Sequence, residues 1–201
     1  MNDAQDARAA YRGPTEPPAD AVLPERHPDA PQPGEGLGTH YPHCFGCGGD
    51  HPQGLHLHAE AAEGVAVTAK FEVTAGHQGA PGLIHGGLLA TAFDEVMGSV
   101  NWMLRVPAVT GRLETDYLKP VPVGRVVHFR GWCVGQAGRK IYHRAEARLD
   151  SPDGQLVARA AALFVAVRLE HFTSNGRAEE VQAVLDDPQT FRSLKAFELN
   201  P

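Results

Sequence analysis

The chain has few cysteines, few aromatic residues and no long hydrophobic run. Three cysteines among 201 residues are an odd number, which argues against a disulfide framework and for a reducing compartment. The longest unbroken apolar run, residues 160–167, is far too short to cross a bilayer. The N-terminus matches neither a secretory nor a mitochondrial leader. We therefore expect a cytoplasmic protein with no membrane partner.

The chain also has no excess of positive charge. The chain carries 18 Lys and Arg against 24 Asp and Glu, which gives a formal net charge of −6. The acidic excess lies in the two ends, because residues 41–171 hold equal numbers of acidic and basic side chains. Nothing resembles the basic stripe or the motifs of a nucleic-acid-binding protein, so we expect no nucleic-acid partner.

Proline and apolar side chains divide the chain into three parts. Residues 1–40 contain seven prolines and almost no large apolar side chains. Such a segment cannot bury enough surface to offset its ordering entropy, so we expect a disordered N-terminal tail over residues 1–40. A folded domain is expected over residues 41–171. Residues 172–201 would form a C-terminal extension that could contain one or two short helices between residues 178 and 199.

Hydrophobic periodicity within the domain predicts two strands, one long helix and four further strands. Alternation of apolar and polar residues favours strands at 55–58 and 65–73, and a mostly apolar helix follows from Gly87 to about Leu104. The last four strands are expected at 109–118, 123–134, 140–149 and 155–167. The final strand is apolar on both faces and should be central in the sheet. This order is typical of an α+β domain in which one antiparallel sheet wraps around one helix.

The long helix carries a stripe of small and polar residues with an acid at its centre. At about 100° per residue, five residues fall within about 40° of one line: Gly87, Thr91, Asp94, Gly98 and Asn101. An acid flanked by apolar turns is unlike a solvated surface charge, so Asp94 is a candidate functional carboxylate. The alternative is a structural acid paired with an arginine across the sheet. Glu95 lies about 100° away and is the weaker candidate.

The start of this helix offers backbone donors. His85 is followed by Gly86 and Gly87, and the first amides of a helix have no internal partner and lie at the positive end of its dipole. Glycine lets a carbonyl oxygen approach such an N–H directly, as in an oxyanion hole. A glycine pair can also serve only a tight turn. Combined with an acid eight residues later in the stripe, the glycine pair becomes a more specific signal of such a site.

Several segments resemble one protein family. The sequence HGGLLATAFDE at residues 85–95 resembles the helix signature of the PaaI-like hotdog-fold acyl-CoA thioesterases. The stretches HQGAPG at 77–82 and LETDYLKPVP at 113–122 are similar to the flanking segments of that family. The motif CFGCG at 44–48, followed by PQGL at 52–55, resembles the branch that contains human thioesterase superfamily member four. The resemblance covers about residues 41–169 and implies a hotdog fold, an antiparallel β-sheet wrapped around one long central helix.

The resemblance implies hydrolysis of acyl-CoA, or of acyl carrier protein thioesters, to a free acid and a thiol, with no cofactor. Asp94 would act as nucleophile or as general base, and the Gly86 N–H would donate to the thioester carbonyl. Thr110 would position the water or the carboxylate. Gln78 would lie near the carbonyl, and His85 would hold the turn. Thioester hydrolysis needs an oxyanion donor and an activated attacking oxygen, and this set provides both.

Substrate binding would need further groups. The phosphates of coenzyme A require cationic partners, and Gly87 is expected to contact the substrate at the helix start. The basic candidates are Lys119, Arg139, Lys140 and Arg168.

Cysteine and histidine cluster between residues 40 and 58. Cys44 and Cys47 form a Cys-x-x-Cys pair with several histidines nearby, which could ligate zinc. A structural zinc site would need a second well-spaced pair, and the sequence lacks one. We therefore predict no metal site and expect this segment to pack against the helix. Cys133 is expected to be a buried core residue.

Two other functions stay open. One is a non-catalytic acyl-CoA-binding or sensor module on the same fold. The other is a hotdog dehydratase or hydratase that would use His77 with Glu95.

The spacing of the site residues also predicts the assembly. Gly86 and Asp94 are about 12 Å apart along the helix, while one carbonyl must lie about 3 Å from both a donor and an attacking group. Two helices running antiparallel across a two-fold axis would place Asp94 of one chain beside Gly86 of the other. We expect a homodimer with two shared sites, which could pair again into a homotetramer.

Overall fold

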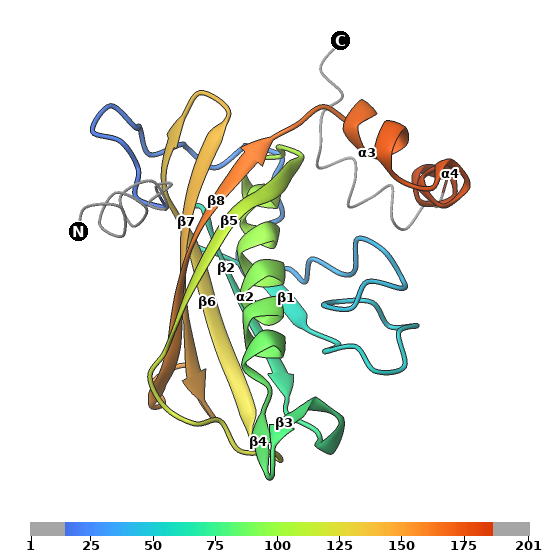
Figure 1. Ribbon diagram of the computed structural model, residues 1–201. Coiled ribbons are helices and arrows are strands. Elements are labelled where there is room, and N and C mark those ends of the chain that lie inside the picture. The colour runs from blue at the N-terminus through green and yellow to red at the C-terminus, as the bar shows by residue number, and fades with distance from the viewer. Residues whose placement is uncertain (1–14, 187–201) are drawn as a thin grey trace, which may run out of the picture.

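One six-stranded antiparallel sheet makes up most of the computed structural model, which describes residues 15–186 (Figure 1). Its strands lie in the order β1-β2-β6-β7-β8-β5. Their bounds are β1 (His58–Ala62), β2 (Ala66–Glu72), β5 (Ala108–Tyr117), β6 (Val126–Ala137), β7 (Lys140–Leu149) and β8 (Leu156–Ala166). A single long helix, α2 (Gly86–Val100), lies along one face of the sheet. The predicted α+β arrangement of one sheet around one helix is confirmed.

The core lies between α2 and the sheet. The helix buries its large apolar side chains there, among them Leu89, Phe93, Val96 and Met97, and each such burial stabilises the fold by about 1.5–3 kcal/mol. Gly131 in β6 lets the helix come close, since a Cβ there would lie 3.0 Å from the Val96 side chain. A 3-10 turn, η2 (Asn101–Met103), extends the helix toward its predicted end. Cys133 is buried in β6, as predicted.

The first strand begins later than predicted. Leu55 and Leu57 are buried, but their N–H groups donate to carbonyls of the preceding loop rather than to a strand. His56 between them has a φ of 48°, which does not fit an extended strand. Sheet pairing starts only at His58. The alternation over residues 55–58 therefore reflects burial beneath a loop.

The two edges of the sheet differ. Residues 34–37 run along β1, where the Gly34 N–H donates to the Ala61 carbonyl at 2.8 Å and the Leu37 N–H to the Ala59 carbonyl at 2.9 Å. At the other edge, β5 pairs with β8 alone within residues 15–186. Strand β8 has partners on both sides, which fits its two apolar faces, but it lies next to the edge rather than at the centre. A bare edge presents unpaired backbone groups to another chain.

The prediction that residues 1–40 are disordered is wrong for residues 15–40. Val22 forms a β-bridge with Gln136, and the His27 N–H donates to the Met103 carbonyl at 2.8 Å. Ala30 and Leu37 are buried against the domain. A few short apolar side chains and backbone hydrogen bonds thus fix a proline-rich segment whose composition suggests disorder. Residues 1–14 of the predicted tail lie outside the described residues.

Smaller elements complete the chain. The turn η1 (Ala75–His77) leads into a hairpin of β3 (Gln78–Ala80) and β4 (Leu83–Ile84) that precedes α2. After β8 come α3 (Glu170–Asn175) and α4 (Ala178–Asp186). The rest of the predicted C-terminal extension, from residue 187, lies outside the described part. Of the helices in residues 15–186, none is long and apolar enough to span a membrane.

Candidate functional site

His85 caps the start of α2 and leaves one backbone donor free. His85 has an extended backbone, and its Nδ1 accepts the Gly87 N–H at 2.9 Å. The Gly86 N–H makes no hydrogen bond within the described part of the chain. Gly86 therefore keeps an open donor at the positive end of the helix dipole. The Gly87 N–H is occupied by His85, so any contact of Gly87 with a substrate would use another atom.

Tyr117 at the end of β5 fixes this helix start. Its hydroxyl donates to the Gly86 carbonyl at 2.8 Å, and a Cβ added at Gly86 would lie 3.4 Å from the Tyr117 ring. The side chain is 54% exposed, so it stands at the open rim of the site. Tyr117 was not predicted from the sequence as a site residue, although the period of two along β5 could have placed it on the helix side.

A β-bulge in β5 aims Thr110 at the helix. The register of β5 on β8 shifts after Thr110, which leaves Gly111 as the extra residue. Because of this extra residue, Thr110 faces α2 together with Leu113, which packs against the core. The Thr110 hydroxyl donates to Asp94 Oδ1 at 2.6 Å. The structure thus brings together two of the predicted catalytic residues.

The Asp94–Thr110 pair has the chemistry of an oriented base. A hydrogen bond to a charged carboxylate is short and strong. It fixes one oxygen of Asp94, while the other has no hydrogen-bond partner among the residues that the structure describes. The Thr110 oxygen still has lone pairs that can accept a water proton. Within residues 15–186, the partner of Asp94 is a hydroxyl and not the arginine of the structural alternative. The half-buried carboxylate can therefore act on a water or on a carbonyl carbon.

Gln78 lies next to the helix start but is held by its own turn. It pairs with Ile84 in the β3–β4 hairpin. Its Nε2 donates to the Ala75 carbonyl at 2.9 Å, and its Oε1 accepts the Gly82 N–H at 2.7 Å. One Nε2 hydrogen remains for a ligand.

The predicted catalytic residues form two groups within one chain. Asp94 and Thr110 meet beside the middle of α2, whereas Gln78, His85 and Gly86 gather at its N-terminus. The helix rise separates Gly86 from Asp94 by about 12 Å. One chain alone therefore cannot hold a single carbonyl between both groups.

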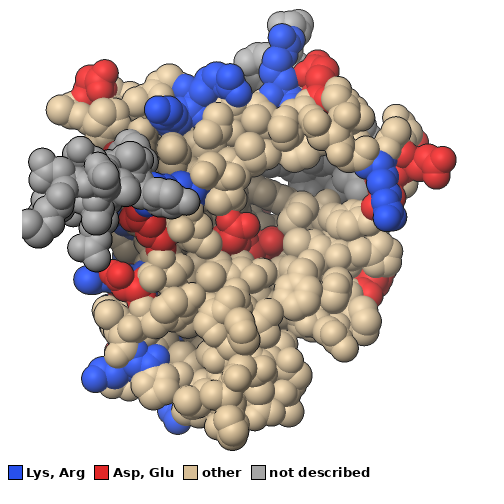
Figure 2. All heavy atoms as spheres, in the orientation of Figure 1, with Lys and Arg blue, Asp and Glu red and all other residues tan. Residues whose placement is uncertain are grey.

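Three of the predicted basic residues lie at one end of β8, and the fourth lies at the other end. Arg139 and Lys140 lie at the end of β8 that holds Ala166, since the Arg139 Nε donates to the Ala166 carbonyl at 2.9 Å. Arg168 and Arg139 line the same open cavity. Lys119 lies beside Val157 at the opposite end of β8, about 30 Å away at the rise of a strand. Figure 2 likewise shows Lys and Arg side chains spread around the rim of one face, with no single basic patch.

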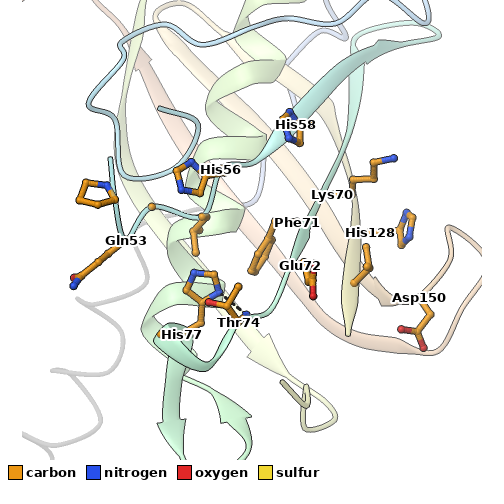
Figure 3. Close-up of a pocket in the computed structure, with 15 residues that line it drawn as sticks. Gln53, His56, His58, Lys70, Phe71, Glu72, Thr74, His77, His128 and Asp150 are labelled. Atoms are coloured by element: carbon orange, nitrogen blue, oxygen red, sulfur yellow. Dashed lines mark hydrogen bonds between the residues drawn. The ribbon is translucent and has the colours of Figure 1, made fainter. Parts of the chain in front are cut away.

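An open cavity of ≈ 770 Å³ lies apart from these residues. It is bounded by loop residues 52–56 and by β1, β2 and β6, and Figure 3 shows several histidines around it, together with Lys70 and Asp150. Neither Gly86, Asp94 nor Thr110 lines it. Its lining therefore does not belong to the candidate catalytic site.

His77 and Glu95, the pair considered for a dehydratase, do not meet. His77 is buried, its Nδ1 accepts the Thr74 N–H at 3.1 Å, and its carbonyl accepts the His85 N–H. Glu95 lies ten residues beyond His85, which is about 15 Å along α2. His77 therefore serves the turn before the helix.

Comparison with known proteins finds similarity to thioesterases. Residues 81–154 match the family model of the thioesterase superfamily. Acyl-coenzyme A thioesterase THEM4 of Xenopus laevis is 34% identical over 88 residues, which make up 44% of this chain and 39% of that protein. The match thus spans about two fifths of the length of that relative.

Two solved structures share the fold. A thioesterase superfamily protein is 27% identical, with a TM-score of 0.57 over 68% of this chain and 70% of its own. A mutant of the phenylacetic acid degradation protein PaaI from Thermus thermophilus is 26% identical, with a TM-score of 0.51 over 56% of this chain and 95% of its own. The matched segment 81–154 includes Gly86, Asp94 and Thr110. The sheet and helix of this chain therefore form a hotdog fold, and residues 81–154 are similar to the thioesterase superfamily.

Proposed function

We propose that the chain hydrolyses acyl-CoA thioesters to a free acid and a thiol at a site shared by two copies of the chain. The observation that carries this proposal is the 2.6 Å hydrogen bond from Thr110 to Asp94 on the helix face beside the open edge strand β5. The name of the relative, an acyl-coenzyme A thioesterase, supports the substrate class.

The open edge of the sheet supports the sharing of the site. Residues 34–37 cover the edge at β1, whereas β5 has an unpaired side within the described residues. Next to β5, the α2 surface around Gly87 and Thr91 is exposed or half-buried and carries small side chains. Two β5 strands paired antiparallel would join two sheets and align two α2 helices antiparallel. Asp94 of one copy would then lie near Gly86 of the other, in a homodimer that could pair again into a tetramer.

The proposed chemistry assigns one task to each group. The Gly86 N–H of one copy polarises the thioester carbonyl and stabilises the developing oxyanion. Asp94 of the other copy either attacks the carbonyl carbon or takes a proton from an attacking water. If Asp94 attacks, the C–S bond breaks to leave the acyl group on Asp94 as an anhydride, and water then breaks this anhydride to release the acid and restore the carboxylate. If Asp94 acts as a base, the water oxygen bonds to the carbonyl carbon directly and the C–S bond breaks. In both routes the thiolate leaves and takes up the proton that the water has lost. Thr110 keeps the Asp94 carboxylate oriented throughout.

A panel of acyl-CoAs with a thiol-detecting reagent tests the proposal. We expect catalytic release of free thiol by the wild type. Asp94→Asn should abolish turnover but leave acyl-CoA affinity within about tenfold, because the carboxylate acts mainly on the transition state. Asp150→Asn is the matched control, since Asp150 follows β7 and forms an exposed ion pair with Arg125, and its turnover should stay close to that of the wild type.

The same panel separates the other functions. Binding of acyl-CoA without thiol release would overturn the proposal in favour of a sensor module. A change in enoyl absorbance without thiol release would indicate a dehydratase.

A further inference from the structure

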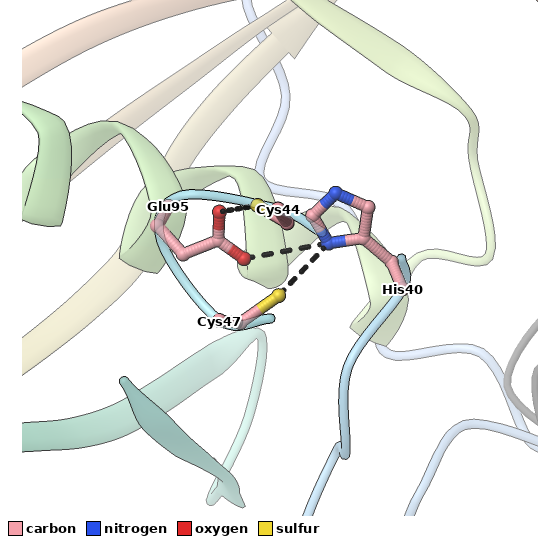
Figure 4. A group of neighbouring side chains, drawn as sticks. All are labelled: His40, Cys44, Cys47 and Glu95. Atoms are coloured by element: carbon pink, nitrogen blue, oxygen red, sulfur yellow. Dashed lines mark hydrogen bonds and ion pairs between the residues drawn. The ribbon is translucent and has the colours of Figure 1, made fainter. Parts of the chain in front are cut away.

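Four metal-ligating side chains converge where a loop meets α2 (Figure 4). His40, Cys44 and Cys47 come from the loop and Glu95 from the helix, and their ligand atoms all lie within 4.8 Å of one another. We propose that this cluster binds one zinc ion as a closed structural site. The proposal is independent of the thioesterase activity.

The separations within the cluster match a tetrahedral shell. His40 Nδ1 lies 3.2 Å from Cys47 Sγ and 3.4 Å from Glu95 Oε1, and Cys44 Sγ lies 3.3 Å from Glu95 Oε2. Zinc bonds of about 2.3 Å to sulfur and about 2.0–2.1 Å to nitrogen or oxygen put tetrahedral ligands about 3.3–3.8 Å apart. These three pairs therefore already lie close to the separations expected around zinc, and all the ligand atoms lie within 4.8 Å of one another.

The loop is shaped to bring these ligands together. A Cβ at Gly46 would lie 2.4 Å from Glu95 Oε2, and one at Gly48 would lie 2.3 Å from the Pro42 carbonyl. The Gly48 N–H donates to the Cys44 carbonyl at 2.9 Å, which closes the turn that holds the cysteines. The two glycines thus admit the Glu95 side chain beneath the loop and let the loop fold back on itself.

The chemical types of the four ligands favour zinc over other divalent cations. Two thiolates, one imidazole and one carboxylate suit zinc and not magnesium or calcium, which prefer oxygen ligands. Four protein ligands leave no position for a reacting water, so the site would be structural. The Glu95 side chain is only 14% exposed and that of His40 is 46% exposed, which gives the ion a path of entry past the imidazole.

This proposal reverses the sequence-based expectation of no metal. The sequence lacks the second pair of Cys or His ligands that a structural zinc site usually has. In the structure, the Glu95 carboxylate of α2 completes the set of ligands. Glu95 lies far along the chain from the cysteines, and only the packing of the loop on the helix brings them together.

Elemental analysis of the full chain, purified in reductant with zinc supplied, tests the site. We expect one zinc per chain in the wild type and a large loss in Cys44→Ser and in Glu95→Gln. His43→Ala is the matched control, because His43 is a loop histidine that packs against Tyr41 outside the cluster. Cys133→Ser controls for the loss of any one cysteine. Both controls should retain zinc.

The absorption spectrum of the wild type with cobalt in place of zinc tests the site without any variant, so the result does not depend on whether a variant folds. We expect thiolate-to-cobalt charge-transfer absorption and the intense visible bands of a tetrahedral site. Zinc content far below one per chain, together with a cobalt spectrum that lacks thiolate bands, would overturn the proposal. So would a Cys44–Cys47 disulfide whose reduction fails to restore zinc binding.

Discussion

Asp94 and Glu95 are adjacent in sequence, yet the helix turns their side chains toward different parts of the structure. Asp94 accepts a hydrogen bond from Thr110 of β5, while Glu95 contacts Cys44 and His40 of the loop. Helical geometry alone predicts this divergence of about 100°. The sequence could therefore single out Asp94, but it could not show that a second carboxylate had partners of its own.

The hydroxyl of Thr110 should matter to catalysis less than Asp94 does. Thr110→Val removes a hydrogen bond to a charged group, which is worth about 1.5–3 kcal/mol, so kcat should fall by about 10- to 150-fold. Thr110→Ser keeps the hydroxyl and should keep most of the activity. Steady-state thiol release measures both, and an unchanged kcat in Thr110→Val would remove this residue from the site.

His143 makes stability depend on pH. The ring is fully buried, its Nε2 donates to Asn101 Oδ1 at 3.0 Å, and its Nδ1 has no hydrogen-bond partner among the described residues. Burial lowers the pKa of His143 from 6.5 to about 3. Between pH 6.5 and about 3, His143 therefore binds a proton in the unfolded chain but stays neutral in the folded chain. This group should destabilise the fold as the pH falls, by about 1.4 kcal/mol per pH unit at most.

Denaturant unfolding between pH 6.5 and 4.5 measures this effect. His143→Gln retains a donor toward Asn101 but does not titrate. The variant should show a shallower loss of stability on acidification than the wild type does, whatever its stability at neutral pH. Equal slopes for the two proteins would contradict the assignment to His143.

Among the elements, those with strong periodicity follow the prediction and those fixed by irregular contacts do not. β7 occupies the predicted residues 140–149, and α2 with η2 fills most of the predicted helix. The hydrophobic pattern does not predict the bulge at Gly111, yet this bulge turns Thr110 toward Asp94. The N-terminal segment from residue 15 was missed because backbone hydrogen bonds, which composition does not show, hold it against the domain.

The docking of this N-terminal segment can be measured with two leucines. Leu37 is 6% exposed and Leu23 is 69% exposed. Leu37→Ala should lower the free energy of unfolding by about 2–5 kcal/mol, as for other buried leucines, whereas Leu23→Ala should change it by less than about 0.5 kcal/mol. Chemical denaturation compares the two, and a negligible effect of Leu37→Ala would show that the segment is not docked in solution.

At the scale of the whole molecule, the separation of Gly86 from Asp94 and the bare edge of β5 point to the same assembly. The helix spacing could be derived from the sequence, and so could the need for a second chain. The difference between the two sheet edges could not be derived from the sequence, because it depends on how residues 34–37 lie along β1. The dimer remains part of the proposed function, and it makes a quantitative prediction.

Complementation between two inactive variants tests the shared site most directly. Asp94→Asn removes the carboxylate, and Gly86→Pro removes the N–H donor at a helix position that tolerates proline. Each should be inactive alone. When equal amounts of the two variants are unfolded and refolded together, about half of the dimers should contain one copy of each variant. Each mixed dimer has one site that lacks both groups and one intact site. About a quarter of wild-type thioesterase activity should therefore return. Mixed dimers that form but show no activity would contradict a site shared between Asp94 of one copy and Gly86 of the other.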